Sequence, residues 1–314
     1  MSSSLLVIVG PTCVGKTAVA VATAQLMPPA ELLNADSRQV RRGLNVATCK
    51  PTAEELDGVR CHLLDLCDPG EPFSVAGWLQ AAREALEDIE HRGARAVVAG
   101  GTGLYVTALV DGYNLALTPA DPARRVQREQ QGATAAGLDA LIRELRERDP
   151  EAAAIVDLLN PRRIIRALEI LDAGSGSLRD ARRSNPVPAL MVGIDAAPEI
   201  HAAWVEARVR RMFAGGELLA ETGGALRAGV EPDDLAGCGI GYSEAMSVLA
   251  GELDSSEAEQ VTVRRTLRYA KAQRTYWRRD KRVRWLRAES ASSEELAGQI
   301  ASWATADSLS AQSV

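Results

Sequence analysis

The sequence predicts an α/β fold in which a P-loop NTPase-like parallel sheet core is interrupted by an inserted all-helical domain. Three observations lead to this prediction. Short apolar segments alternate with helical segments through residues 1–118, the first apolar segment runs into a glycine-rich turn, and residues 119–185 show helical periodicity alone. Strands alternating with helices indicate a parallel sheet, because parallel neighbours need long crossover connections. Residues 186–314 are expected to complete the core and to form basic C-terminal helices.

The first part of the core is expected to contain three buried strands and two helices. Each strand is a short run of mainly apolar residues, which is typical of a strand covered on both faces. The longer helix follows Ser74, a residue type that caps helix N-termini. The strands are expected at 5–9, 30–34 and 95–99, and the helices at 16–26 and 74–92.

The insertion is expected to be helical from 121 to 171, and its breaks are Gly132, Gly137 and Pro161. Two prolines before residue 189 mark the return to the core, where the apolar run 189–195 predicts another strand. Most of the remaining chain has helical character with glycine-rich breaks. The Ser/Ala-rich tail after Glu289 is expected to fray.

Composition narrows the classes of protein that the chain can belong to. Its five cysteines form no Cys-x-x-Cys pair and its three histidines sit at no metal-ligand spacing, which disfavours zinc and a disulfide framework. Scattered thiols indicate a reducing, cytoplasmic location. No apolar run approaches the roughly 20 residues that span a bilayer, and the N-terminus lacks the basic segment of a signal peptide. We expect a monomer without membrane association.

The turn after the first strand matches the P-loop pattern G-x-x-x-x-G-K-[ST]. Its residues are Gly10, Pro11, Thr12, Cys13, Val14, Gly15, Lys16 and Thr17. The glycines allow backbone N–H groups to surround phosphate oxygens, and the helix N-terminus adds partial positive charge. Lys16 supplies a further charge, and Thr17 supplies a hydroxyl for Mg²⁺. The segment therefore predicts a site for a nucleotide or a diphosphate.

A carboxylate, Asp36, follows the second strand, at the sheet edge where ligands bind in such folds. The strand at 95–99 ends in glycines and lacks the acid that many P-loop enzymes use to hold Mg²⁺. Asp36 is therefore a candidate to accept a proton or to hold a metal-bound water. The alternative is that Asp36 and Ser37 only cap the next segment.

A strongly basic segment runs from Arg264 to Arg287, with eleven basic residues and one acid, Asp280. The whole chain has a net charge of −6, but a bulk average does not exclude a local basic surface. Aromatic residues are interleaved with these cations, as in many surfaces that bind RNA. A solvated basic face is the alternative interpretation.

An ordered series of motifs resembles the tRNA dimethylallyltransferase family. The motifs are Gly10–Thr17, Asn34–Val40, Thr48–Thr52, Asp68–Val75, Gly100–Tyr105, Arg163–Glu169 and Tyr269–Asp280. The resemblance implies transfer of a dimethylallyl group from dimethylallyl diphosphate to N6 of the adenosine 3′ of the anticodon in tRNA. It also implies that the P-loop holds a prenyl diphosphate with Mg²⁺ rather than a nucleoside triphosphate, which agrees with the missing strand-end acid.

The resemblance also implies roles for individual residues. Asp36 would be the general base, and Arg208 would contact the diphosphate together with the P-loop. The implied catalytic set is Asp36, Lys16, Thr17, Thr102 and Arg208. The implied tRNA contacts are Asp36, Ser37, Arg38, Gln39, Thr102, Arg125, Arg162, Arg163, Ile164, Ile165, Arg166, Gly241, Tyr242, Lys271, Gln273, Arg274 and Arg278.

Some positions depart from the family pattern, and they concern tRNA contact more than the prenyl-transfer core. These positions are Arg41, Arg60 to His62, Arg162, Ala272, Arg274 and Ser243. The main alternative function is prenyl transfer to free AMP, ADP or ATP, which requires neither the insertion nor the basic helix. A small-molecule P-loop kinase and a non-catalytic RNA-binding protein are further alternatives.

Overall fold

The structure is a computed structural model, and it describes residues 5–113, 121–172 and 186–311. The chain divides into two compact units. One unit comprises residues 1–110 and 187–314, and the other comprises residues 111–186. The domain boundaries expected at 118/119 and 185/186 involve residues that lie outside the described ranges. Each unit is described by itself below.

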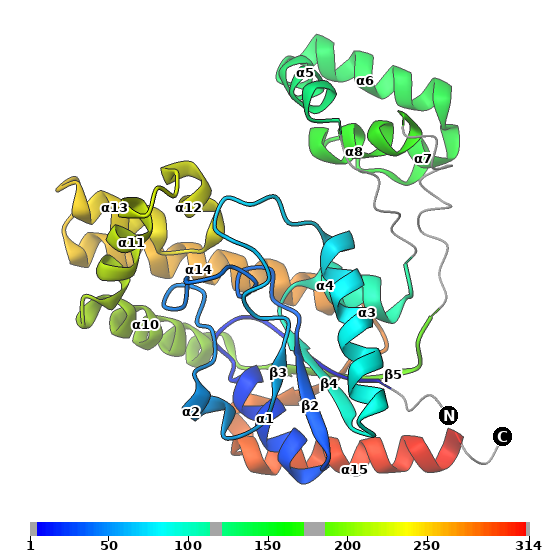
Figure 1. The fold of residues 1–314 in the computed structure, drawn as a ribbon, viewed down its shortest axis with the longest axis vertical. Helices are drawn as coiled ribbons and strands as arrows, with labels where there is room; N and C mark the ends of the chain where they lie inside the picture. The colour runs from blue at the N-terminus through cyan, green and yellow to red at the C-terminus, as the bar shows by residue number, and fades with distance from the viewer. Residues whose placement is uncertain (1–4, 114–120, 173–185, 312–314) are drawn as a thin grey trace. The chain divides into compact units, whose positions relative to one another are not determined.

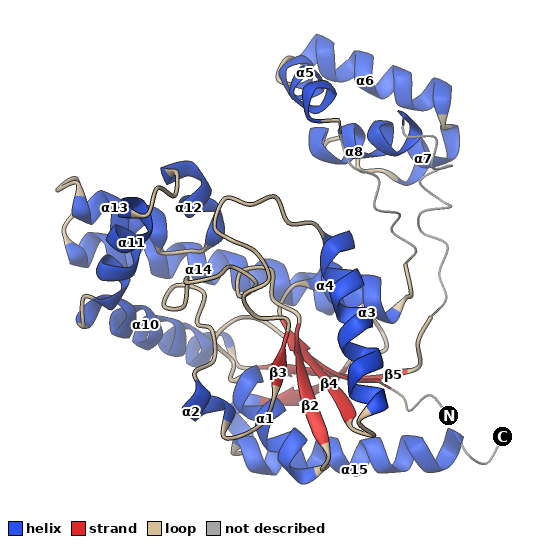
Figure 2. Cartoon of the chain, in the orientation of Figure 1, coloured by secondary structure: helices blue, strands red, loops and turns tan. Residues whose placement is uncertain are grey.

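The larger unit is built on a six-stranded parallel sheet in the order β3-β2-β4-β1-β5-β6 (Figure 2). The strands are β1 (Leu5–Val9), β2 (Ala30–Asn34), β3 (Cys61–His62), β4 (Arg95–Gly100), β5 (Ala189–Asp195) and β6 (Arg284–Arg287). Leu6 of β1 lies opposite Val97 on one side and Leu190 on the other, so the fully apolar β1 is central. The predicted α/β class and its parallel P-loop-like core are confirmed. The outer strands β3 and β6 are additional to the predicted ones.

Helices surround this sheet (Figure 1). They are α1 (Lys16–Leu26), α2 (Ala53–Leu56), α3 (Val75–His91), α4 (Gly103–Val110), α10 (Pro198–Ala214), α11 (Glu217–Arg227), α12 (Pro232–Cys238), α13 (Tyr242–Leu249), α14 (Ser255–Trp277) and α15 (Ser293–Ala311). Leu6 and Ile8 of β1 belong to the core cluster that α1 and α15 cover. The Ser74 hydroxyl caps α3 by accepting from the Gly77 amide at 3.2 Å, as predicted. None of the described helices combines the length and the apolar composition that crossing a membrane requires.

The expectation that the tail after Glu289 frays is wrong. Residues 293–311 form α15, and Leu296, Ile300 and Ala304 are buried against the core. Their spacing of four residues places them on one helical face. The helix starts at a capping box in which the Ser292 hydroxyl accepts from the Glu295 amide and the Glu295 carboxylate accepts from the Ser292 amide. The composition suggested fraying because alanine and serine are frequent in the tail, and composition does not reveal that its apolar residues share one face.

The smaller unit holds four helices in its described residues: α5 (Pro122–Gly132), α6 (Ala135–Arg148), α7 (Pro150–Ile155) and α8 (Pro161–Asp172). Its core is aliphatic and contains Leu141, Leu145, Ile164, Ile165 and Leu168. The four helices enclose this core, and their opposite faces carry most of the arginines of the unit. The unit therefore has an apolar centre of its own.

Truncating the core side of α15 tests whether the tail is part of the folded core. Ile300→Ala is expected to lower the free energy of unfolding by about 2–5 kcal/mol, because it removes a fully buried side chain. The neighbouring exposed Gln299→Ala is the matched control and should change it by less than about 0.5 kcal/mol. Equal stability of the two variants in urea unfolding would contradict the packing of α15.

Candidate active site

The P-loop occupies the turn between β1 and α1 and takes a conformation that depends on its glycines. Gly10 has φ of 146°, and a Cβ there would lie 2.1 Å from the carbonyl oxygen of Ile194 in β5. Gly15 has φ of 79° and precedes the first turn of α1, where it is the N-cap residue. Both positions are closed to side chains, one by the neighbouring strand and one by its left-handed backbone. The loop therefore presents backbone N–H groups and the N-terminus of α1 at the end of the sheet.

Three long-range hydrogen bonds hold Thr12 at the centre of the P-loop. Its amide donates to Gln273 Oε1 at 2.8 Å, and its carbonyl oxygen lies 2.8 Å from His201 Nε2. Its hydroxyl oxygen accepts from Arg208 Nη1 at 3.0 Å. These partners come from α10 and α14, so the C-terminal helices fix the shape of the loop.

A buried ion pair behind the loop sets the orientation of His201. Asp195, at the end of β5, accepts from Arg274 Nε at 2.9 Å through both oxygens. An Nη of Arg274 lies 3.1 Å from His201 Nδ1. Because a guanidinium only donates, Nδ1 accepts and the Nε2–H donates to Thr12. Burial lowers the pKa of His201, and the nearby Arg274 charge lowers it further, which favours this neutral tautomer.

Lys16 lies in the first turn of α1, where its ammonium group donates to the carbonyl oxygen of Pro11 at 2.6 Å. Burial lowers the pKa of Lys16 to about 8, although the negative charge of Asp36 opposes the shift. Arg208 adds a second cation, which donates to Cys13 Sγ at 3.0 Å as well as to Thr12. Two side-chain cations therefore meet at the loop that surrounds the predicted diphosphate.

Asp36 lies two residues beyond β2, and its Oδ1 accepts from the Arg38 amide at 2.9 Å. Thr102, just after β4, braces this turn. Its hydroxyl oxygen accepts from the Ser37 amide at 2.9 Å, its hydroxyl donates to Ser37 Oγ, and its amide donates to Ala35 at 3.1 Å. The guanidinium of Arg38 stacks 4.8 Å above the Tyr269 ring. The loops after β2 and β4 thus hold the carboxylate at the carboxyl end of the sheet.

Two clefts adjoin the P-loop, and Arg208 lines both. The larger cleft, of about 420 Å³, is also lined by Cys13, Gly15, Trp204 and Arg211. The second cleft contains Asp36 and Tyr269 together with Thr12. An anion in the first cleft would meet two arginines and the P-loop, whereas a group in the second would meet the carboxylate. The arrangement suits a reaction between a phosphorylated compound and an acceptor that loses a proton.

The donor set fits Mg²⁺ only with a phosphorylated ligand present. Among the described residues there is no cluster of three or more His, Cys, Asp or Glu side chains that would hold a metal ion. Mg²⁺ usually keeps several waters and binds through one or two protein oxygens plus substrate phosphates. The Thr17 hydroxyl, in the first turn of α1, would be one such protein oxygen.

The structure divides the predicted RNA contacts of the larger unit into exposed and internal residues. Lys271 and Arg278 are exposed on α14. Gln273 is buried and bridges Thr12 to the Gly101 carbonyl at 3.0 Å, and Arg274 is 18% exposed in its pair with Asp195. These two side chains support the P-loop from the interior of the larger unit, in contrast to the expectation that they face RNA. Gln39 is likewise turned inward and donates to the carbonyl oxygens of Thr48 and Cys49.

Gly241 and Tyr242 also have internal roles. Tyr242 is fully buried and donates to Glu221 Oε1 at 2.7 Å. Gly241, with φ of 119°, starts α13 and donates its amide to Glu244. The expectation that the Tyr242 side chain contacts RNA is not supported, because no part of it reaches the surface.

In the smaller unit, the predicted contacts separate by helix face. Arg162 and Arg163 are exposed, and Arg125 and Arg166 are partly exposed. Ile164 and Ile165 lie in the aliphatic core, so their side chains are not exposed, and contact of these two positions with RNA stays a prediction. The alternation of apolar and basic residues along α8 explains the division, because residues three and four apart share a face.

Sequence reasoning did not identify Asp195 or His201. Asp195 had a usable signal, since it follows an apolar strand in the same way as Asp36. His201 had none, because its partner Thr12 is 189 positions away.

The pKa of Lys16 predicts a pH dependence of diphosphate binding. A lysine with pKa near 8 is charged below that pH and loses its proton above it. Affinity for dimethylallyl diphosphate should therefore be steady near pH 7 and fall by up to about tenfold per unit above pH 8. Calorimetric titration across this range measures the effect. Lys16→Arg is the control, because it keeps its charge and should remove the decline. An identical decline in that variant would trace it to another group.

Comparisons with known proteins agree with this geometry. The IPP transferase family model matches residues 39–280, and the isopentenyl transferase model matches residues 3–68. A tRNA dimethylallyltransferase of Corynebacterium urealyticum is 38% identical over 94% of this chain and 90% of its own, and one of Salinispora tropica is 40% identical over 89% and 86%. The solved tRNA isopentenylpyrophosphate transferase of Bacillus halodurans is 34% identical, with a TM-score of 0.71 over 99% of both chains. The chain belongs to the IPP transferase family.

Proposed function

We propose that this protein transfers a dimethylallyl group from dimethylallyl diphosphate to N6 of the adenosine 3′ of the anticodon in tRNA. The observation that carries the proposal is that Asp36 lies in a cleft lined by Arg208. Arg208 also lines the cleft beside the P-loop. Relatives at 38% and 40% identity are tRNA dimethylallyltransferases, and membership of their family supports the same reaction.

The diphosphate end of the reaction requires neutralisation of negative charge. When the bond between the allylic carbon and the diphosphate oxygen breaks, the leaving diphosphate takes the electron pair. Lys16, Arg208 and the P-loop amides are the donors that stabilise this developing charge. Mg²⁺, held through Thr17 and the diphosphate, would supply further charge neutralisation when bound.

The acceptor end requires removal of a proton. The adenine N6 attacks the allylic carbon and must then lose one hydrogen, for which a positioned carboxylate is suitable. In this proposal Asp36 accepts that proton, while the Arg38 amide and the turn braced by Thr102 hold the carboxylate in place. The exocyclic amine is inaccessible in a stacked anticodon loop, so the base must be extruded into the cleft beside Asp36 and Tyr269.

The choice of tRNA over a free nucleotide rests on surface charge. Lys271 on α14 and Arg278 just after it are exposed. They flank Gln273 and Arg274, and Gln273 bonds the P-loop directly. The helical unit adds further exposed arginines, and a mononucleotide requires no such set of surface cations. Prenyl transfer to AMP remains the second candidate because it requires the same diphosphate site at the P-loop. A cytoplasmic location is part of the same proposal.

Replacing Asp36 tests its role as the base. Asp36→Ala should slow the chemical step by roughly 10²- to 10⁴-fold, the range typical of general base catalysis. Single-turnover kinetics with tRNA and dimethylallyl diphosphate measure this rate, while separate titrations should show both substrates still bound. A rate close to wild type would mean that Asp36 only shapes the turn before Arg38.

The exposed cations of α14 distinguish tRNA from AMP. Lys271→Ala with Arg279→Ala removes two exposed cations, and it should weaken binding of an anticodon stem-loop and flatten the dependence of log affinity on log salt by about one to two units. Affinity for dimethylallyl diphosphate should stay unchanged. Arg60→Ala with Arg227→Ala removes two exposed arginines elsewhere on the same unit and is the matched control. Equal slopes in both double variants would remove the assignment of α14 to RNA.

A further inference from the structure

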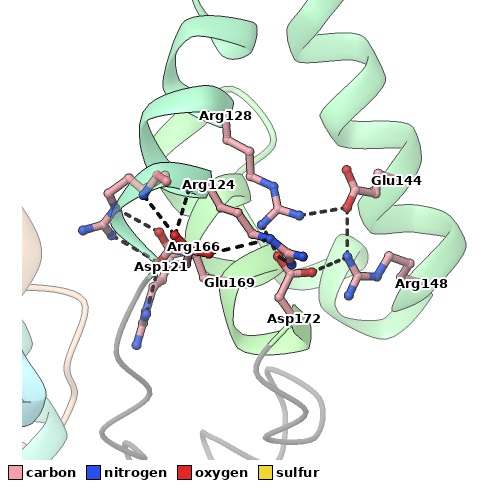
Figure 3. A network of polar contacts seen from close by, with 10 residues as sticks. Asp121, Arg124, Arg128, Glu144, Arg148, Arg166, Glu169 and Asp172 are labelled. Atoms are coloured by element: carbon pink, nitrogen blue, oxygen red, sulfur yellow. Dashed lines mark hydrogen bonds and ion pairs between the residues drawn. The ribbon is translucent and has the colours of Figure 1, made fainter.

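A buried carboxylate in the smaller unit holds two arginines from different helices. Glu169 of α8 is 4% exposed, and its Oε1 lies 2.9 Å from Arg125 Nε while its Oε2 accepts from Arg125 Nη2 at 3.2 Å. The same Oε2 accepts from Arg166 Nη1 at 3.1 Å. One carboxylate thus fixes a guanidinium of α5 and a guanidinium of α8, as Figure 3 shows for Arg166.

The charges at this point do not cancel. Two guanidiniums carry two positive charges and Glu169 carries one negative charge, so the cluster keeps one net positive charge. Each guanidinium has five N–H donors, and Glu169 accepts one hydrogen bond from Arg125 and one from Arg166, while Arg125 Nε makes a further ion-pair contact with Oε1. The two arginine side chains remain 45% and 38% exposed. Donors and charge are therefore available on the surface of the unit.

A second ion-pair cluster in the same unit keeps the same net positive charge of one, but it joins three helices and its central arginine is more buried. Asp172 contacts Arg124, Arg128 and Arg148, and Glu144 contacts the last two (Figure 3). Arg128 is only 12% exposed, and its contacts join α5 to α6 and α8. This cluster shares its three cations between two carboxylates and ties helices together. Its role is therefore structural, because it holds the helices of the unit together, and we call this cluster the clasp.

We infer that Glu169 is a positioning residue, which holds Arg125 and Arg166 as a two-pronged receptor for an RNA phosphate group. The inference rests on the proposed function, since it needs RNA as the substrate. Arginine forks recognise phosphate through paired, planar N–H donors, and their planes must be set before binding for the pair to act together. Glu169 sets both planes by binding one edge of each guanidinium and leaving the others to solvent.

The sign of the effect distinguishes positioning from neutralisation. If Glu169 only cancels positive charge, Glu169→Gln makes the unit more basic and should tighten RNA binding. If it positions the fork, the same variant frees two flexible side chains and should weaken anticodon stem-loop binding by about tenfold, because ordering them then costs affinity. The salt dependence of log affinity should flatten by about one unit, since a phosphate contact is lost.

Asp172→Asn is the matched control, because it neutralises a similarly paired carboxylate on the same helix. It should leave RNA affinity and its salt slope at wild-type values, and it should lower the thermal unfolding temperature because the clasp loses its ion pairs. A second variant, Arg125→Lys with Arg166→Lys, keeps both charges but removes the planar forks. It should weaken RNA binding as Glu169→Gln does, whatever the change in stability. Dimethylallyl diphosphate affinity should be constant throughout.

The outcomes distinguish failure of the positioning role of Glu169 from failure of the proposed function. Unchanged or tighter RNA binding in Glu169→Gln, with normal binding by wild type, would overturn the positioning role and leave the proposed function intact. Equal weakening in Glu169→Gln and Asp172→Asn would assign both carboxylates to general stability and would also overturn it. Absence of specific stem-loop binding by the wild-type protein would instead overturn the tRNA substrate.

Discussion

The hydrogen bonds to Thr12 are the constraint on which the candidate site depends. The amide and the carbonyl oxygen of this residue are bonded by side chains 261 and 189 positions further along the chain. Without them the P-loop would lose its bonds to Gln273 and His201 and would depend on β1, α1, the contacts of Lys16 and Arg208, and the close approach of Gly10 to Ile194. The conformation of the P-loop therefore depends on the larger unit as a whole. The contacts from α10 and α14 contribute to it as much as the residues of the motif do.

Helix α14 and the residue that follows it combine two tasks. Gln273 and Arg274 point inward to the P-loop and to Asp195, whereas Lys271 and Arg278 are exposed. The basic segment from Arg264 to Arg287 therefore contains both cations that pair with a buried carboxylate and cations that are exposed. Arg274 compensates a buried carboxylate, and removing it would leave Asp195 with the Ala196 amide at 2.9 Å and the more distant cation of Arg278 at 3.3 Å. Counting basic residues alone overstates the charge that the helix offers to RNA.

The sequence was sufficient where structure follows from local pattern. The strands β1, β2, β4 and β5 are short apolar runs, and the P-loop and Asp36 follow from strand ends. The two-residue β3 is too short for any periodicity, and β6 is hidden in a basic segment because Arg284 and Arg287 are exposed on either side of Leu286. The inward orientation of Gln273 and Tyr242 depends on tertiary packing, which motif matching does not contain. Ile164 and Ile165 could have been placed in a core from helical periodicity alone.

The packing of α15 on α1 has a consequence for how the protein is made. The first helix to leave the ribosome carries Val19, Ala20 and Ala24, which belong to a core completed by Leu296, Ile300 and Ala304. The apolar face of α1 therefore stays uncovered until almost the entire chain has been synthesised. The strands that flank β1 in the sheet, β4 and β5, are separated in the sequence by the helical unit at 111–186, which can collapse around its own core in the meantime. We expect the nascent larger unit to be a chaperone client, and a ribosome-stalled chain that ends before residue 293 to expose α1 to protease.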